Sequence, residues 1–274
     1  MRLGLIGFGN IATTLLGLLK QSGHAPLDSL TVLGLPESAA ATDAALEADF
    51  KGIAKQCTVV MDAAALLAQS PDLVVECAGH AAAAAHVPAV LRAGIDTVQV
   101  SVGALADAAL EASLRQAALD GNARLILPAG AVGGIDLLAA LRPAGGLKVT
   151  YRGIKPPQAW AGTPAAALLD LETLNERRVF FSGSAREAAR EYPKNANVAA
   201  TLALAGAGFE ATQAELIADP AAKGNIHEYS VTSPLTQFTM RIENAPSAGN
   251  AKTSVATVYS VLREITNRLG PVAI

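Results

Sequence analysis

The chain opens with its most constraining feature, a glycine pattern that directly follows a short apolar run. Residues 2–12 read RLGLIGFGNIA, so Gly7, Gly9 and Ala12 have the spacing G-x-G-x-x-A. Between a strand and a helix this spacing predicts a dinucleotide site, because the glycines permit a tight turn and a close approach of a pyrophosphate to the backbone. The small third residue lets the helix pack on the strand. The cofactor contacts expected here are Gly7, Gly9, Asn10, Ile11 and Ala12.

The residues after the glycine pattern have the order expected of a helix and a second strand. Residues 11–20 are amphipathic, and the apolar run SLTVLGL arrives at residues 29–35, within the roughly 30 residues that a βαβ unit needs. This strand ends at Gly34 and Leu35 rather than at the carboxylate that usually holds the ribose 2′-hydroxyl of NAD. Glu37 is the nearest carboxylate, and no arginine stands nearby to hold a 2′-phosphate. We therefore expect both NAD and NADP to be accepted.

Composition excludes several classes of protein. The 274 residues, of which 51% are apolar, suffice for two domains with a substantial core. The net charge of −3, with both signs interspersed, gives neither a basic stripe for nucleic acid nor a polybasic patch for a membrane, and no apolar run has spanning length. Cys57 and Cys77 are too few and too far apart for a disulfide framework or a zinc site. We expect a cytoplasmic protein without a metal.

Alternating strand and helix patterns continue to Gly130. They predict an α/β fold, a doubly wound parallel sheet of the Rossmann type. Leu73 to Val75 has the continuous apolar character of a buried parallel strand, which places Cys77 and Ala78 just beyond its carboxyl end. Ligands of open α/β sheets bind at that edge, so Cys77 and Ala78 are further expected cofactor contacts.

The pattern changes at PAGAVGG, residues 128–134, which is either a loop over the nicotinamide end of the cofactor or a plain inter-domain turn. Beyond it, mixed helical and extended pieces predict a smaller α+β domain with a mixed sheet, including an alternating strand over residues 232–244. Residues 250–269 have helical periodicity, with Asn250 or Thr253 as the cap, and are expected to return to the first domain. The expected domains are residues 1–130 plus 245–274 for the dinucleotide and residues 131–244 for the substrate.

His227 is the candidate acid–base group, because it lies in a polar, glycine-containing loop, DPAAKGNIHEYSV, between a strand-like run and the next strand. Of the other histidines, His24 lies in a turn, and His80 and His86 lie in or beside an alanine-rich helix. A histidine near its unperturbed pKa takes up and returns a proton at neutral pH. A second concentration of polar groups precedes an apolar helix expected from about Val198. There, Asn197 is either the helix cap or, with Lys194, a group that contacts a nicotinamide or an anionic substrate.

The assembled motifs resemble those of the L-aspartate dehydrogenases, which supply the first step of NAD synthesis in some bacteria and archaea. The first motif, GFGNIA, is shared by many dehydrogenases, whereas the later ones are specific to this family. Together they cover most of the chain in order. The later motifs are VVECAGH from Val74, PAGAVGGID from Pro128, YPKNANVAATLALAG from Tyr192, ADPAAKGNIHEYSV from Ala218 and NAKTSVATVYSVL from Asn250.

This resemblance implies a Rossmann domain, a second domain that also mediates homodimer formation, and oxidation of the amine of L-aspartate with NAD or NADP. The product, iminoaspartate, hydrolyses to oxaloacetate and ammonia or passes to quinolinate synthesis. The resemblance further implies that His227 is the catalytic group and that Ala131 and Asn197 contact the cofactor. The substrate carboxylates need cations or backbone amides, for which the candidates are Lys194, Lys252, Thr253 and Ser254.

Two other classes stay open on the sequence. One is a different amino-acid-pathway enzyme of similar build, such as homoserine dehydrogenase or dihydrodipicolinate reductase, although the motifs associated with their substrate domains are absent. The other is a non-catalytic dinucleotide-binding protein, such as a redox-sensing regulator. It would keep the glycine turn but would have no need of polar loops around His227.

Overall fold

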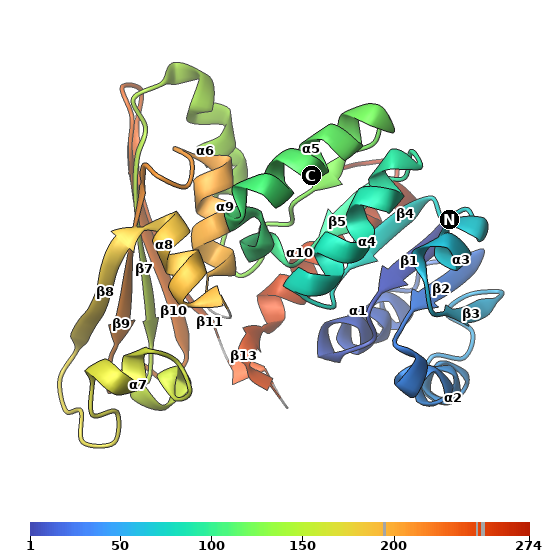
Figure 1. Ribbon diagram of the computed structural model, residues 1–274, viewed down its shortest axis with the longest axis horizontal. Helices are drawn as coiled ribbons and strands as arrows, with labels where there is room; N and C mark the ends of the chain where they lie inside the picture. Colours follow the sequence, from blue (N-terminus) through green and yellow to red (C-terminus); the bar gives the residue numbers. More distant parts are fainter. Residues whose placement is uncertain (194–195, 245, 248–249) are drawn as a thin grey trace. The chain divides into compact units, whose positions relative to one another are not determined.

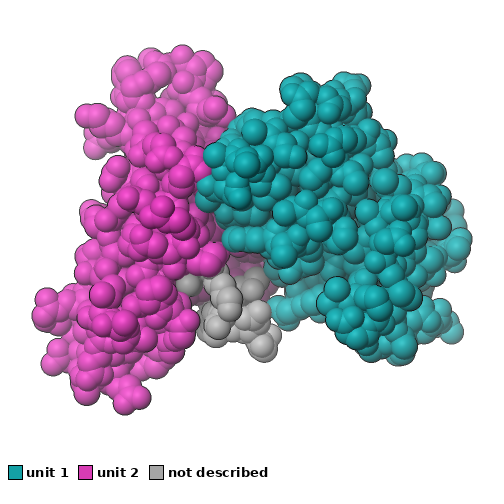
Figure 2. Space-filling view, in the orientation of Figure 1, with its two compact units in different colours: residues 1–128, 258–274 teal, residues 129–257 magenta. Residues whose placement is uncertain are grey.

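The computed structural model describes residues 1–193, 196–244, 246–247 and 250–274, and its description of side chains leaves out those of 246–247 and 250–253. The chain forms two compact units, coloured separately in Figure 2. Unit 1 comprises Met1–Pro128 and Val258–Ile274, and unit 2 comprises Ala129–Thr257. The chain therefore re-enters unit 1 at Val258, later than residue 245, where the sequence placed the return. Within the described residues, no helix has the length and apolar content to cross a bilayer.

Unit 1 is built on six parallel strands in the order β3-β2-β1-β4-β5-β6 (Figure 1). The order reverses between β1 and β4, which is the switch point where sheets of this class bind ligands. The predicted Rossmann-type sheet is thus confirmed. The strands are β1 (Arg2–Ile6), β2 (Ser29–Leu33), β3 (Cys57–Val60), β4 (Leu73–Glu76), β5 (Thr97–Gln99) and β6 (Leu125–Ile126).

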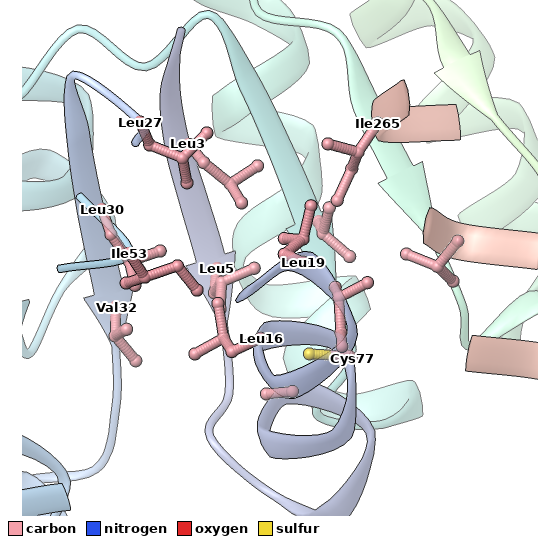
Figure 3. Packing of buried hydrophobic residues seen from close by; sticks show 14 of the residues in the cluster. Leu3, Leu5, Leu16, Leu19, Leu27, Leu30, Val32, Ile53, Cys77 and Ile265 are labelled. Carbon is pink, nitrogen blue, oxygen red and sulfur yellow. The ribbon is translucent and has the colours of Figure 1, made fainter. Parts of the chain in front are cut away.

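Helices connect these strands and bury them. Leu3 and Leu5 of β1 share one apolar cluster with Leu16 and Leu19 of α1, and Ile265 of α10 joins it from the far end of the sequence (Figure 3). This packing explains the near-continuous apolar runs of the strands, because both faces of a doubly wound sheet are covered. The helical elements are α1 (Asn10–Gln21), η1 (Pro36–Ser38), α2 (Ala39–Asp49), α3 (Ala63–Ala68), α4 (His80–Arg92), η2 (Val102–Ala106), α5 (Ala108–Asp120) and α10 (Val255–Leu269).

Unit 2 contains the predicted mixed sheet, in the order β11-β10-β7-β9-β8. β7 and β9 run parallel and the other pairs run antiparallel. Its strands are β7 (Lys148–Lys155), β8 (Arg178–Ser184), β9 (Thr212–Ala218), β10 (Asn225–Thr232) and β11 (Gln237–Asn244), with a separate pair β12 (Pro246–Ser247) and β13 (Asn250–Ser254). Its helical elements are α6 (Ile135–Leu141), η3 (Arg142–Ala144), η4 (Pro157–Trp160), α7 (Ala165–Leu168), α8 (Ala185–Glu191) and α9 (Asn197–Ala205).

The two faces of this sheet differ in polarity. On one face, Arg152 bridges Glu215 and Glu228 at 2.7 and 3.1 Å, and Arg241 reaches Glu228 at 3.0 Å, so an ion-pair ladder crosses four strands. On the other face, the end of α9 at Gly206 lies against Val149 of β7. Side chains alternate along a strand, so Tyr151 and Gly153 share the helix-covered face with Val149.

Two details of the expected fold are wrong. Residues 232–244 form not one strand but the turn and second arm of a hairpin, because β10 ends at Thr232 and β11 begins at Gln237. The Oγ of Ser233 accepts the N–H groups of Leu235 and Thr236 and closes that turn. The alternation expected for this segment does hold within β11, where exposed and half-buried residues alternate.

The last helix also begins later than residue 250, where the sequence placed its start. Residues 250–254 form β13, and α10 starts at Val255. The cap is neither Asn250 nor Thr253, since the Oγ of Ser254 accepts the N–H of Ala256 at 3.2 Å. The apolar spacing did not fix the start of the helix, because residues 250–254, NAKTS, contain one apolar residue. Pairing with β12 supplies these residues with backbone hydrogen bonds that compete with a helical turn.

Candidate functional site

The glycine turn of unit 1 has the geometry of a dinucleotide-binding loop. Gly7 has φ +94°, and a Cβ added there would lie 2.6 Å from the Cβ and 2.9 Å from the Cα of Ala78. Gly9 has open space around its Cβ position and is the N-cap of α1, where no side chain caps the helix. The first-turn N–H groups of α1, from Asn10, are therefore left to an outside acceptor, and Ala12, in the first turn of α1, is fully buried. These residues fit the pyrophosphate of a nicotinamide dinucleotide.

A buried carboxylate fixes the neighbouring loop at the end of β4. Glu76 is fully buried and accepts the N–H groups of Ala78 and Gly79 at 2.9 and 2.8 Å. It also accepts the N–H and the hydroxyl of Ser101 at 3.1 and 3.0 Å. Hydrogen bonds of this number offset much of the cost of burying a charge. Glu76 therefore holds the loops after β4 and β5 together at the sheet edge.

Cys77 and Ala78, both predicted to contact the cofactor, differ in the exposure of their side chains. Ala78 is exposed and packs on Gly7, at the glycine turn. Cys77 is buried in the apolar cluster of Figure 3, with its Sγ 3.6 Å from the carbonyl oxygen of Ile6. Burial raises the pKa of the Cys77 thiol, so it stays protonated. Only the backbone of Cys77 is suited to a cofactor contact.

In unit 2, His227 is paired with a tyrosine that the sequence did not single out. His227 lies on β10, opposite Gly153 of β7, and its Nδ1 is 2.8 Å from the hydroxyl oxygen of Tyr151. A Cβ at position 153 would lie 2.8 Å from that hydroxyl oxygen, so the glycine provides the space that the phenol crosses to reach the imidazole. Gly153 therefore makes the tyrosine–histidine pair possible.

The environment of this pair keeps both groups uncharged. His227 is 6% exposed, and burial together with the charge of Lys155 lowers the pKa of His227 to about 3. Burial raises the pKa of the Tyr151 phenol, so it stays protonated. A neutral imidazole has one unprotonated ring nitrogen, the form required of a general base, although the low pKa makes that nitrogen a weak base unless a negative charge comes near.

The lowered pKa of His227 predicts an acid-labile contribution to stability. A histidine has a pKa near 6.5 in the unfolded chain, so the unfolded state binds the extra proton as the pH falls from about 6.5 toward 3. Between about pH 7.5 and pH 5 the free energy of unfolding should fall by about 2 kcal/mol more for the natural protein than for His227→Gln. Denaturant unfolding at both pH values measures this difference.

The exposed His24 provides a matched control, because His24→Gln should follow the natural protein at both pH values. An equal pH dependence in the natural protein and in His227→Gln would contradict a depressed pKa at His227.

The glycine-rich loop after β6 is held by side chains from the β10–β11 hairpin. The hydroxyl of Tyr229 donates to the carbonyl oxygen of Gly133 at 2.6 Å, and the amide of Asn244 donates to that of Ala131 at 3.3 Å. Ser254 in turn donates its hydroxyl to the Oδ1 of Asn244 at 2.8 Å. Through Asn244, the structure thus connects two residues predicted for the site, Ala131 and Ser254.

The remaining predicted residues are placed as follows. Asn197 is exposed and is the first residue of α9, with Ala196 at the N-cap. The alternative that Asn197 caps this helix is therefore wrong, and its contact with the cofactor stays a prediction. Lys252 and Thr253 belong to β13, but their side chains lie outside the described residues, as does all of Lys194. The hydroxyl of Ser254 is engaged with Asn244 and with the first turn of α10.

Two residues absent from the sequence-based prediction belong to the histidine's surroundings, Tyr151 and Lys155. Both lie on β7 and, with Gly153, on the sheet face that carries His227. The sequence contained a signal for them, because KVTYRGIK alternates and places Tyr151 and Lys155 at the same parity. The sequence did not reveal the register between β7 and β10, which places these two side chains on the same face of the sheet as His227.

A hollow of about 450 Å³ in unit 2 lies where β10 begins and β11 ends. Asn225 and Asn244, which are paired across the hairpin, line it together with Lys223 and Arg241. His227 is two residues beyond Asn225 on the same strand face. Across the described residues, no group of three or more His, Cys, Asp or Glu side chains has the arrangement of a metal site.

Comparison with protein families gives a match over each part of the chain. Residues 136–268 match the model of the aspartate dehydrogenase C-terminal domain. Residues 7–128 match the model described as the NAD-binding domain of homoserine dehydrogenase.

Similar proteins extend these matches to nearly the full length. The chain is 44% identical over 98% of its length to L-aspartate dehydrogenase of Polaromonas, covering 97% of that protein. It is 46% identical over 90% of its length to the L-aspartate dehydrogenase of Ruegeria pomeroyi, with 90% of that protein covered. The crystal structure of aspartate dehydrogenase from Thermotoga maritima is similar over 100% of this chain and 99% of that one, with a TM-score of 0.75 and 27% identity.

Proposed function

Because this chain belongs to the L-aspartate dehydrogenase family and is thus an oxidoreductase acting on L-aspartate, we propose that His227 is the general base of its reaction. The observation that carries the proposal is the buried, neutral His227 bonded through Nδ1 to Tyr151. This pair lies in the part of the chain that matches the family's own C-terminal domain.

The reaction removes two electrons and two protons from the substrate. L-Aspartate loses a hydride from its α-carbon and a proton from its nitrogen, which gives iminoaspartate. Water then adds to the C=N bond and releases ammonia, leaving oxaloacetate. The nicotinamide dinucleotide, when bound, supplies the acceptor for the hydride. The protein must supply a group that accepts the proton from the nitrogen or from the attacking water.

His227 meets this requirement in one of its two tautomers. If Nδ1 carries the proton and donates it to the hydroxyl oxygen of Tyr151, Nε2 has a free lone pair and accepts the substrate's proton. Tyr151 then fixes the ring orientation and stabilises the imidazolium that forms. This division of labour makes Tyr151 a positioning residue for the base.

The activity on which the proposal rests is measured by the rate of reduced-nicotinamide formation, followed by absorbance, with L-aspartate as the substrate. An alkaline pH favours the assay, because deprotonating the substrate ammonium assists oxidation. We expect activity with L-aspartate and, in reverse, with oxaloacetate plus ammonia. Activity with homoserine or dihydrodipicolinate instead of L-aspartate would indicate a related amino-acid-pathway enzyme. Cofactor binding without turnover of any of these substrates would indicate a sensor.

We expect both NAD and NADP to serve as the cofactor. β2 ends at Leu33, and the next side chain is the exposed Leu35, so no described carboxylate ends this strand. The ratio of kcat/KM for the two cofactors should stay below about a thousandfold, which corresponds to roughly 4 kcal/mol. Parallel assays with NAD and NADP measure it, and a larger ratio would contradict the argument.

Leu35→Asp is the matched variant for this prediction. Because Leu35 is 63% exposed, a carboxylate is tolerated there without burial of a charge. It should repel the 2′-phosphate and lower NADP use at least tenfold while sparing NAD.

Three further properties belong to the same proposal. Iminoaspartate would feed quinolinate synthesis and hence NAD biosynthesis, which a coupled assay with a quinolinate-forming enzyme measures. The protein would be a cytoplasmic homodimer assembled through unit 2. Light scattering measures the oligomeric state, and cell fractionation measures the location.

A further inference from the structure

A buried lysine shares the sheet face of His227. Lys155 is the last residue of β7 and is 7% exposed. His227 is paired with Gly153, and side chains alternate along β7, so Lys155 points to the same side of the sheet as His227 and Tyr151. One buried face of unit 2 therefore carries a neutral base, its positioning phenol and a lysine ammonium.

Contacts with neighbouring residues fix the position of the Lys155 ammonium. The Nζ of Lys155 lies 5.1 Å from the centroid of the Trp160 ring, in a cation–π arrangement. The Trp160 indole is itself held, because its N–H donates to the carbonyl oxygen of Ile217 at 3.0 Å. The backbone of Lys155 is also anchored, since its carbonyl oxygen accepts the N–H of Asp219. Lys155 is thus positioned by its surroundings rather than free to sweep through solvent.

The charge of Lys155 reaches the imidazole. Burial is the larger cause of the lowered pKa of His227, and the positive charge of Lys155 lowers it further. A cation is thus near enough to the proposed base to oppose its protonation. For a substrate without negative charge, this arrangement would weaken the base.

L-Aspartate has the complementary charges. It presents two carboxylates close to the α-carbon at which the reaction occurs, and each requires a cation or several N–H donors when it leaves water. A carboxylate placed on the Lys155 ammonium would offset the field that disfavours imidazolium. Substrate binding would then strengthen the base at the moment that it is needed.

We propose that Lys155 is a substrate-binding residue that pairs with a carboxylate of the amino acid beside His227. This inference rests on the proposed function. It adds to Lys194 and Lys252, the lysines that the sequence suggested, a lysine that the fold places on the face of His227. It also assigns specificity, because a neutral replacement at 155 should remove the preference for a dicarboxylate.

The test compares Lys155→Met with Lys148→Met, a lysine exposed at the other end of the same strand. We expect Lys155→Met to raise the KM for L-aspartate at least a hundredfold and to raise the inhibition constant of succinate, an unreactive dicarboxylate, in parallel. NADH affinity, measured by fluorescence, should change less than threefold. Lys148→Met should match the natural protein in all three measurements, and Lys155→Arg should recover part of the loss because it keeps the charge.

A KM and a succinate inhibition constant within threefold of the natural values in Lys155→Met would overturn the proposal. Should Lys155→Met fail to fold, calorimetric titration of Lys155→Gln with succinate tests the same prediction, namely that loss of the charge weakens dicarboxylate binding. Lack of L-aspartate oxidation by the natural protein would instead refute the proposed function, so the two failures are distinct. In that case succinate titration of the natural protein and of Lys155→Gln still tests the carboxylate site, and equal affinities would overturn it.

Discussion

Replacing His227 by glutamine is expected to lower turnover of L-aspartate by roughly 10²–10⁴-fold, the usual loss when a general base is removed. Glutamine keeps a polar side chain opposite the Tyr151 hydroxyl, which lies 2.8 Å from Nδ1 in the natural protein. It has no group that accepts a proton at neutral pH. Steady-state rates measured with saturating L-aspartate and cofactor give the loss in kcat directly.

Two controls separate chemistry from folding in that experiment. NADH affinity and, at pH 7.5 and above, the melting temperature should stay close to the natural values, because the effect of His227 on the free energy of unfolding is expected at acidic pH. Tyr151→Phe keeps the imidazole and removes only its partner, so we expect a smaller loss of kcat, with a changed pH profile. If His227→Gln retains more than about a tenth of the turnover, His227 is not the base.

Adding one methyl group at Gly7 is expected to destabilise unit 1 by roughly 2–4 kcal/mol. Part of this cost is the left-handed backbone, at φ +94°, which disfavours any side chain. The rest is steric, because the new Cβ would lie 2.6 and 2.9 Å from the Cβ and Cα of Ala78, and a backbone atom cannot turn aside as a side chain does. Denaturant unfolding of Gly7→Ala measures the change.

Gly9→Ala is the matched control, because its effect should appear in binding and not in stability. Gly9 has φ −97° and nothing within 4 Å of its Cβ position, so alanine fits the protein alone. The methyl group would project into the space through which a pyrophosphate approaches the start of α1, and we expect dinucleotide affinity to fall at least tenfold. Equal stability losses in Gly7→Ala and Gly9→Ala would contradict this division of roles.

Much of unit 1 was predictable because its signals are local. The turn at Gly7 and Gly9, the apolar run of β1 and the helix that follows adjoin one another in sequence, and the strand at Leu73 is read in the same way. The sequence-based predictions were wrong where residues distant in sequence determine the local structure. The hairpin turn at Ser233 and the strand at Asn250–Ser254 depend on pairing partners that periodicity does not reveal.

The candidate site divides along the same line. The sequence alone pointed to the candidate residues, namely the glycines of the turn and His227, because these carry their chemistry in local pattern. Its expectation that His227 lies in a loop with an ordinary pKa was wrong, since His227 lies on β10 and is buried. Only the tertiary structure paired His227 with Tyr151 and placed Lys155 on its face, since that depends on the register of β10 against β7. The burial of His227 in the folded protein lowers its pKa, and the sequence by itself does not determine that burial.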